Sequence, residues 1–138
     1  MVISKALTLQ TKGNGDTHDL TQAVARVVHE SSVRDGVVTL FVIGSTAALT
    51  TIEFEPGAVA DLQTAFEKIA PRQGEYEHHL RWGDDNGNSH VRAAMLGPSL
   101  SVPFVEGQLT LGTWQQIILV DFDTRARERR IAAQIIGE

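Results

Sequence analysis

Few segments of this chain space their apolar residues as a helix does, and this small number of expected helices most constrains the fold. Apolar residues recur at steps of three and four in only two clear segments, residues 19–32 and residues 56–70. A third, shorter helix is expected at residues 89–96, where Ser89 can serve as its cap and Gly97-Pro98 ends it. About three helices are too few for a regular series of parallel βαβ units. The sequence therefore predicts an α+β fold with mainly antiparallel sheets.

Most of the remaining chain has the composition of strands. Strands are expected at residues 1–11, 37–43, 49–55, 100–105, 108–111, 115–123 and 130–136. Residues 106–107, Glu-Gly, predict a hairpin turn between the fourth and fifth of these. The run 37–43 is almost continuously β-branched or aromatic, which predicts a strand buried on both faces. Residues 71–88 are polar without a clear period, and connections of that length are usually functional or disordered.

Size and composition describe an ordinary globular protein. The 138 residues predict one domain spanning residues 1–138. Hydrophobic residues make up 42% and charged residues 21% of the chain, which is typical of soluble domains. No cysteine is present, which excludes disulfides and thiolate metal sites. Because neither a signal-peptide pattern nor a long apolar run occurs, we expect a cytoplasmic protein that does not associate with membranes.

The charge balance bears on the class of partner. A net charge of −5 argues against a broad nucleic-acid surface, and the one basic cluster, residues 125–130, also contains Glu128. That cluster is read as a solvated charge run, although arginines in such a run can also bind phosphate. A small anion can still bind locally, because the field of a pocket is set by its own residues.

Two acidic residues offer one candidate site. Glu53 and Glu55 lie two apart in a predicted strand, so both carboxylates are expected on the same face, roughly 7 Å apart. Like charges that close raise one another's pKa, which suits acid–base chemistry or metal binding. A solvated strand face explains the same pattern equally well.

The polar centre of the sequence lies at residues 75–90 and contains three of the five histidines. Imidazole and carboxylate groups such as those of His78, Asp84 and His90 are the expected ligands of zinc or manganese where cysteine is absent. Their spacing matches no metal motif. A structured surface loop, in which Asp and Asn side chains bond their own backbone, would look similar.

Two further segments can be interpreted in two ways each. Gly44-Ser45-Thr46 follows a predicted strand, so its amides and hydroxyls can face an anion, but a tight turn also needs small residues. Trp114 and Gln115 precede an apolar strand. A tryptophan at such a place can pack its ring into the core and direct its N–H to a partner, so a core anchor is the interpretation that the position favours.

The order of these segments resembles that of the YjbQ-like family, small proteins often described as secondary thiamine-phosphate synthases. The most specific portion is Leu111-Gly112-Thr113-Trp114-Gln115, and the resemblance covers nearly the whole chain. The other matching stretches are residues 46–49 with Glu53, residues 84, 86–87, 89–93, 97–104 and 107–110, and the terminal arginines.

The resemblance implies a compact α+β homotrimer with a polar pocket near the subunit boundaries. It also implies a weak thiamine-phosphate-synthase activity, which joins a hydroxyethylthiazole phosphate to a pyrimidine pyrophosphate and releases pyrophosphate. Such a reaction normally uses a divalent cation, here Mg or Zn, and donors that neutralise the leaving phosphates.

The resemblance also assigns candidate roles to individual residues. Proton transfer or catalysis falls to Glu53, Asp84 and His90. Substrate binding falls to Ser45, Thr46, Asn86, Arg92, Trp114 and Gln115. The metal ligands would be His78, Asp84 and His90.

Two departures from the family pattern matter. Many members carry a histidine where this chain has Gly44, and many carry another where it has Asn88. Two imidazoles of a plausible metal site are therefore missing. Alongside the enzyme hypothesis stand a non-catalytic module that binds a small phosphorylated metabolite, and a structural protein whose family-like segments only build a trimer.

Overall fold

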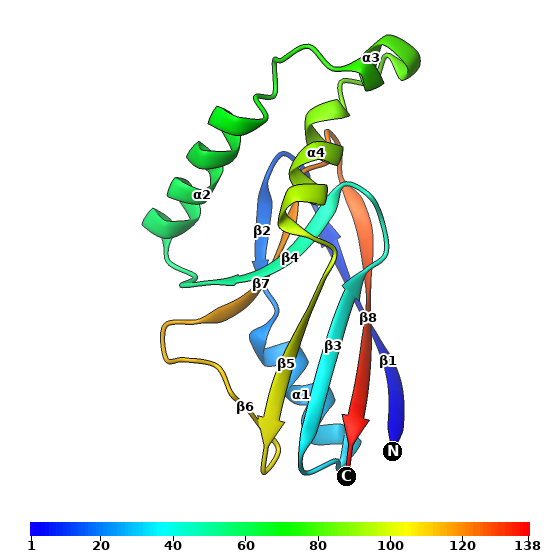
Figure 1. The fold of residues 1–138 in the computed structure, drawn as a ribbon, viewed down its shortest axis with the longest axis vertical. Coiled ribbons are helices and arrows are strands. Elements are labelled where there is room, and N and C mark those ends of the chain that lie inside the picture. The colour runs from blue at the N-terminus through cyan, green and yellow to red at the C-terminus, as the bar shows by residue number, and fades with distance from the viewer.

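The computed structural model describes residues 1–138 as eight strands and four helices (Figure 1). The strands are β1 (Val2–Thr11), β2 (Asp16–Asp19), β3 (Gly36–Val42), β4 (Ala47–Ile52), β5 (Ser99–Val105), β6 (Gln108–Leu109), β7 (Gln116–Asp121) and β8 (Arg127–Gly137). The helices are α1 (Thr21–Ser31), α2 (Pro56–Ile69), α3 (Glu77–Trp82) and α4 (Gly87–Leu96). Every strand pairing is antiparallel, so the predicted α+β class is confirmed.

The strands form two sheets, and the main core lies between them. The larger sheet has the order β1-β8-β3-β5-β6 and the smaller has the order β2-β7-β4. Val38 of β3, Ile135 of β8 and Leu119 of β7 are fully buried in this core. Helix α1 completes it with Val24 and Val28, two residues that share one helix face because they are one turn apart.

A second, smaller core lies on the other face of the three-stranded sheet. Ile118 and Val120 of β7 point into it, where Phe66 of α2 and Phe122 meet edge to face with ring centroids 5.0 Å apart. Because consecutive residues of a strand point to opposite faces, β7 is covered by apolar side chains on both sides. It is the strand on which the two cores meet.

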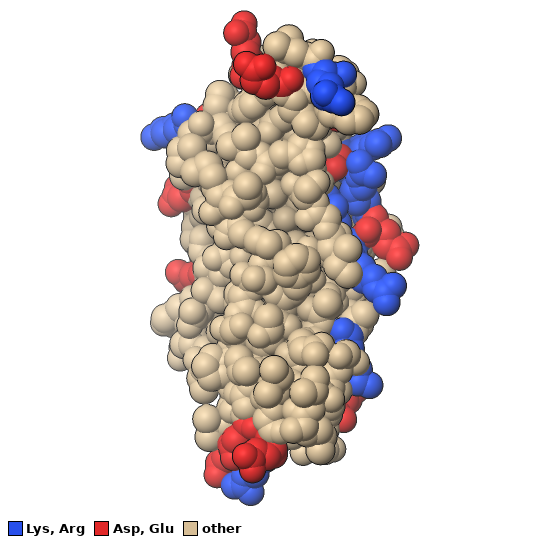
Figure 2. Space-filling view, turned by 45° about the vertical axis from the view of Figure 1, so that its right-hand side comes forward, with Lys and Arg blue, Asp and Glu red and all other residues tan.

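Strand β3 is buried on one face only, which corrects the prediction for residues 37–43. Phe41 of β3 is 47% exposed and Thr39 is half-buried, since no layer covers the outer face of the five-stranded sheet. The face shown in Figure 2 carries its charged side chains mainly around the rim and few in the middle. Ser101 and Gln134 flank Thr39 on the outer face of this sheet, so the centre of that face is uncharged and mixed in polarity. Glu128 and Arg130 lie on the same face at the start of β8.

The predicted carboxylate pair does not share a strand face, because β4 ends before it at Ile52. Glu55 is instead the N-cap of α2, and its carboxylate accepts hydrogen bonds from the backbone N–H groups of Gly57 (2.7 Å) and Ala58 (2.8 Å). These two N–H groups lower the pKa of Glu55. The residue has a structural role at the start of the helix.

The remaining local differences are small. The polar segment 71–88 contains α3, and the predicted turn at residues 12–16 leads into the short strand β2. The Glu106-Gly107 hairpin and the three expected helices are confirmed. None of the helices has both the length and the apolar character needed to cross a bilayer.

Candidate functional site

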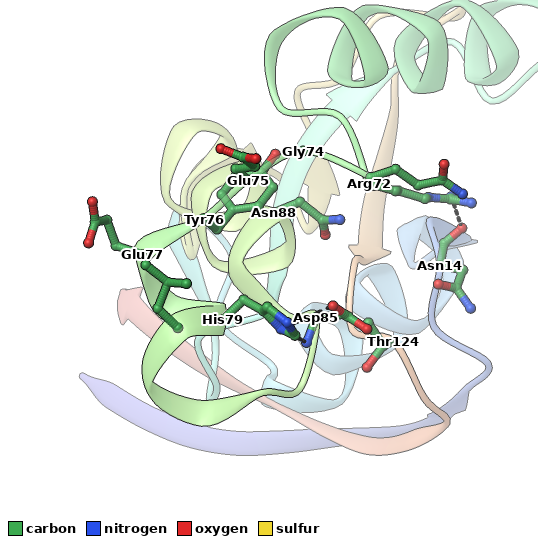
Figure 3. Close-up of a pocket in the computed structure, with 12 residues that line it drawn as sticks. Asn14, Arg72, Gly74, Glu75, Tyr76, Glu77, His79, Asp85, Asn88 and Thr124 are labelled. Atoms are coloured by element: carbon green, nitrogen blue, oxygen red, sulfur yellow. Dashed lines mark hydrogen bonds and ion pairs between the residues drawn. The ribbon is translucent and has the colours of Figure 1, made fainter.

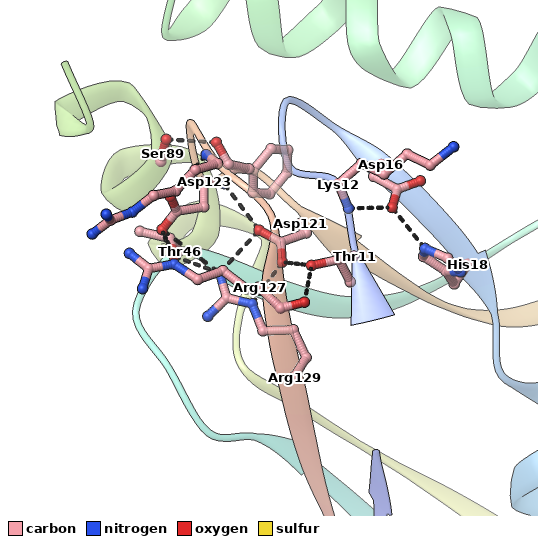
Figure 4. Close-up of polar contacts among 12 residues, drawn as sticks. Thr11, Lys12, Asp16, His18, Thr46, Ser89, Asp121, Asp123, Arg127 and Arg129 are labelled. Carbon is pink, nitrogen blue, oxygen red and sulfur yellow. Dashed lines mark hydrogen bonds and ion pairs between the residues drawn. The ribbon is translucent and has the colours of Figure 1, made fainter. Parts of the chain in front are cut away.

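A buried ionic network occupies the end of the three-stranded sheet where β4 begins and β7 ends (Figure 4). Asp121, the last residue of β7, is fully buried. Its carboxylate accepts bonds from Arg129 Nε (2.6 Å), Arg129 Nη2 (2.9 Å) and the Thr11 hydroxyl (2.5 Å). Burying two charges costs desolvation energy that only such complete pairing offsets, so Arg129 and Asp121 depend on each other.

A second carboxylate, that of Asp123, lies next to this pair and is also buried. It accepts hydrogen bonds from the Thr46 hydroxyl (2.8 Å) and from Asn86 Nδ2 (3.2 Å), and Arg127 Nε lies 3.3 Å away. Burial raises the pKa of Asp123, but these hydrogen bonds and the charge of Arg127 together lower it further, so the net pKa lies below its usual value. Asp123 is therefore ionised at neutral pH.

The loop before β4 has one side inside this network and one side in solvent. The Thr46 hydroxyl donates to Asp123 and accepts from Arg129 Nη2 (2.6 Å), so the predicted anion donor Thr46 is already used within the chain. Gly44 and Ser45 are exposed, and their backbone N–H groups have no partner in the chain. Their amides remain free to meet a ligand.

Arg129 faces this loop with the one guanidinium nitrogen that it does not use in the network. Nε and Nη2 are engaged by Asp121 and Thr46, whereas Nη1 makes no hydrogen bond within the chain. A Cβ on residue 44 would lie 2.7 Å from Nη1, and Gly44 has a φ of +149°, a region that favours glycine. The glycine therefore leaves room for the outer edge of a buried cation.

Helix α4 begins beside the network without a side-chain cap. Asn86 occupies the N-cap position, but its Oδ1 accepts from the backbone N–H of Thr124 (3.3 Å) and its Nδ2 donates to Asp123. The side chain is thereby diverted from the capping role that asparagine usually plays. Asn86, which the resemblance marks as substrate-binding, connects the helix to the loop after β7.

The three residues predicted as metal ligands lie near one another. The His78 and His90 rings are 4.5 Å apart between centroids, and His78 Nδ1 is 3.2 Å from Asp84 Oδ1. No three His, Asp or Glu side chains are arranged so that they could hold a metal ion together. The donor set present does not fit a bound divalent cation, and Mg or Zn remains a prediction of the resemblance alone.

Glu53 lies at the opposite end of the three-stranded sheet. Ala47 pairs with Asp121 at one end and Ile52 pairs with Gln116 at the other, with about 3.3 Å of rise per residue between them. Glu53 follows Ile52, so it lies away from Asp84 and His90 within one chain. The proposed catalytic trio of Glu53, Asp84 and His90 is not assembled by a single chain.

Trp114 and Gln115, in the loop before β7, differ in their contacts with the rest of the chain. Trp114 is 74% exposed in the loop before β7, so the core-anchor interpretation is wrong for the single chain. The loop passes outside both cores, which leaves its indole without a packing layer. Gln115 donates from Nε2 to the Thr51 hydroxyl (3.1 Å) and ties the loop to β4.

Arg92 also has a role other than the predicted one. It is 2% exposed and donates from Nε to the Ala70 carbonyl (2.9 Å) and from Nη2 to Glu67 (2.7 Å). These contacts hold α4 against the end of α2. The geometry gives Arg92 a structural role, and its contact with an anion stays a prediction of the resemblance.

Sequence reasoning missed Asp121, Asp123 and Arg129, which form the centre of the network. A signal was present, because residues 127, 129 and 131 share one face of β8 and Ile131 is a typical core residue. Strand alternation therefore places Arg129 on the inner face. Treating residues 125–130 as one solvated run concealed this alternation.

Comparison with known proteins places the chain in a family. The family model described as UPF0047 protein YjbQ-like matches residues 5–138, and the chain belongs to this family. A UPF0047 protein of Methanothermobacter thermautotrophicus is 34% identical over 99% of this chain and 94% of its own length. One of Archaeoglobus fulgidus is 36% identical over 94% of this chain and 98% of its own.

Solved structures agree with the fold. The crystal structure of a YbjQ-like protein of unknown function from Sulfolobus solfataricus has a TM-score of 0.94 and 33% identity, covering 100% of this chain and 99% of that one. An uncharacterized conserved protein of the yjbq/upf0047 family from Clostridium acetobutylicum has a TM-score of 0.87 and 31% identity, covering 96% and 99%. The similarity thus extends over the complete arrangement of both sheets.

Proposed function

We propose that this chain binds a small phosphorylated metabolite, in the cytoplasm, at the loop formed by Gly44 and Ser45. The observation that carries the proposal is the position of Arg129. Its guanidinium is held rigidly by Asp121 and Thr46, and the unpaired Nη1 lies against a glycine whose amide is also unpaired. Preorganised N–H donors and a fixed guanidinium edge are the groups that recognise phosphate oxygens.

The local charge balance supports an anionic ligand. Between residues 121 and 130 the chain has four arginines and three carboxylates, a net charge of +1 in a protein whose total is −5. Asp121 and Asp123 are buried and already compensated by arginine and hydroxyl groups. The electrostatic field outside the network is therefore set by arginines. A positive local field attracts phosphate.

The departure at position 44 favours binding over histidine-dependent catalysis. Where many YjbQ-like proteins have a histidine, Gly44 removes the side chain and exposes Arg129 Nη1. A guanidinium keeps its proton at neutral pH, so it can neutralise a phosphate but cannot shuttle protons. The site is suited to holding an anion.

The test is a titration with inorganic pyrophosphate and phosphate, followed by calorimetry and by thermal unfolding. A ligand that binds the folded state raises its stability by RT ln(1 + [L]/Kd). Gly44→Ala should weaken binding at least tenfold, because the added methyl group would occupy the space beside Nη1. Gly112→Ala is the matched control, since its Cβ would meet nothing closer than 3.6 Å. Equal pyrophosphate affinity in the two variants would refute the proposed site.

A second candidate is thiamine-phosphate-synthase-type transfer within a homotrimer. The grouping of His78, His90 and Asp84 favours it, as does the uncharged centre of the outer face of the five-stranded sheet, which suits self-association. Glu53 would then reach the histidines from a neighbouring subunit. Purified protein with both thiamine precursors and magnesium should form product that His90→Ala lacks, and sedimentation should give three times the chain mass of 15.0 kDa. Product at the His90→Ala level, or a monomeric mass, would eliminate this candidate.

A further inference from the structure

A hollow in the surface lies apart from the loop formed by Gly44 and Ser45, which is called the anion loop below. None of the residues that line the hollow belongs to that loop. It has a volume of about 830 Å³ and opens between the segment that leads into α3, the start of α4 and the turn before β2 (Figure 3). The lining residues that matter here are Asn14, Arg72, Asp85, Asn88 and Thr124. Only two of its twelve lining residues are hydrophobic, so a ligand would be held by polar contacts.

Asn88 is the most buried polar side chain of this cleft, with 4% of its surface exposed. Its Oδ1 is placed 3.0 Å from the Ser89 hydroxyl, and its Nδ2 has no partner in the chain; the two atoms exchange places if the amide is turned by half a turn. Figure 3 shows the amide directed into the open space of the cleft. A buried polar group that is satisfied on one side only calls for a partner on the other side.

The hydrogen bonds of Ser89 decide which amide atom faces the cleft. The Ser89 hydroxyl lies 2.6 Å from the carbonyl oxygen of Phe122, which can only accept, so the single hydroxyl proton is donated there. The same hydroxyl must then accept from Asn88. An asparagine side chain exchanges its oxygen and nitrogen by a half turn about its last bond. The nitrogen therefore faces Ser89, and the carbonyl oxygen faces the cleft.

The charged groups around this oxygen are mostly acidic. Asp85 borders the same open space, with its carboxylate 3.0 Å from His79 Nδ1. Glu75 and Glu77 also line the cleft, although the Glu77 carboxylate points away from it. The one permanent cation is Arg72, which donates to the Asn14 carbonyl at the far side. Carboxylates thus outnumber permanent cations among the residues that line the cleft.

We propose that this cleft binds a small molecule carrying an ammonium group, which donates to the Asn88 carbonyl oxygen and lies beside Asp85. The guanidinium of Arg72 gives the same molecule a second anchor if it also carries an acidic group. A buried carbonyl oxygen and a carboxylate are the acceptors that an ammonium group, with three donors and no acceptor, requires. The site is independent of the anion loop and goes beyond the proposed function.

The experiment uses three probes of equal chain length: 4-aminobutyrate, butylamine and butyrate. Calorimetry and amide-resonance titration on the full chain should detect the two amines, with 4-aminobutyrate bound more tightly and butyrate at least tenfold more weakly. Butyrate binding equal to that of 4-aminobutyrate would overturn the proposal. Because no probe contains phosphate, this result is separate from the fate of the Gly44 site.

Variants assign the contact to particular atoms. Asn88→Leu should weaken amine binding at least tenfold, because it removes the carbonyl oxygen that faces the cleft. Asp85→Asn should weaken binding severalfold, and Glu77→Gln, whose carboxylate points away, should not. Because Asp85 and Glu77 are exposed, these two variants keep the test valid if a substitution at the buried Asn88 unfolds the chain. Equal amine affinity in Asp85→Asn and Glu77→Gln would contradict the assignment.

Ser89 supplies a readout without any ligand. If Asn88 donates to the Ser89 hydroxyl, Ser89→Ala should shift the side-chain amide proton resonances of Asn88. An unchanged resonance would show that the nitrogen faces the cleft, and the ammonium proposal would then fail.

Discussion

The two ends of the three-stranded sheet contrast sharply. Where β4 begins and β7 ends, Asp121, Asp123 and Arg129 are buried and, apart from Arg129 Nη1, are hydrogen-bonded within their own chain. Where β4 ends and β7 begins, Glu53 and Trp114 are exposed. Both ends contain residues of the family pattern, yet only the first is complete in one chain. The difference shows that one set of family-like residues is largely satisfied by contacts within the chain, whereas the other set is exposed.

The largest loss of unfolding free energy should follow from removing the guanidinium of Arg129. Arg129→Met leaves Asp121 buried without its partner, and breaking a buried pair in this way costs about 3–5 kcal/mol of unfolding free energy. Urea denaturation measures the loss. The double variant Asp121→Asn with Arg129→Met is the control and should recover part of it. A loss below about 1 kcal/mol would show that the contrast between the two ends has no energetic basis.

A smaller effect is expected at the loop beside this cation. Gly44→Ala forces a side chain into a φ of +149° and within 2.7 Å of Arg129 Nη1, which should cost about 1–3 kcal/mol. At the other end of the sheet, Gly112→Ala should stay within about 0.5 kcal/mol. The same denaturation curves compare the two, and equal losses would contradict the difference between the ends.

The pH dependence of the unfolding free energy should be set by Asp123, at the buried end of the three-stranded sheet. The pKa of Asp123 is lowered in the folded state, so its contribution is fully present above the unfolded value of about 3.9 and is lost as pH falls through the folded pKa. Unfolding free energy measured from pH 6 down to pH 2 should fall more steeply below about pH 4 in the wild type than in Asp123→Asn. Parallel curves would mean that Asp123 does not titrate differently on unfolding.

The smallest effect is expected at the exposed end. Gln115→Ala removes two exposed hydrogen bonds, one from Gln115 Nε2 to the Thr51 hydroxyl and one from the Gly112 backbone N–H to Gln115 Oε1. Such surface changes usually stay within about 0.5 kcal/mol. If Trp114 and Gln115 contact another subunit, the substitution should instead shift the oligomer equilibrium in sedimentation. A large loss of stability in the isolated chain would contradict the assignment of this end to outside partners.

The fold was largely predictable because its signals are local. The spacing in α1 and α2 and the β-branched content of β3 and β7 determine element type without tertiary information. Burial of β3 was mispredicted because a β-branched run cannot reveal whether a layer covers its second face. The strand boundary at Ile52 was missed because the alternation continues past it into the cap of α2.

The site was less predictable, because it depends on contacts between distant residues. The grouping of His78, Asp84 and His90 follows from their closeness in sequence and was predicted. Arg129 meets Thr46 from 83 residues away, a contact that no local pattern encodes. The residue types that the resemblance marked as ligand-binding, such as Thr46 and Arg92, are satisfied by such long-range partners.

The diverted cap of α4 has a mechanical consequence. The side-chain amide of Asn86 donates a hydrogen bond to the carboxylate of Asp123 and accepts one from the backbone N–H of Thr124. These two bonds connect the first turn of α4 to the loop after β7. Any displacement of that loop by an occupant on its outer side would be transmitted to the turn that carries Asn88 and Ser89. Hydrogen exchange at the Thr124 amide would then report on an occupant of the Gly44–Ser45 loop as well as on one in the cleft lined by Asn88.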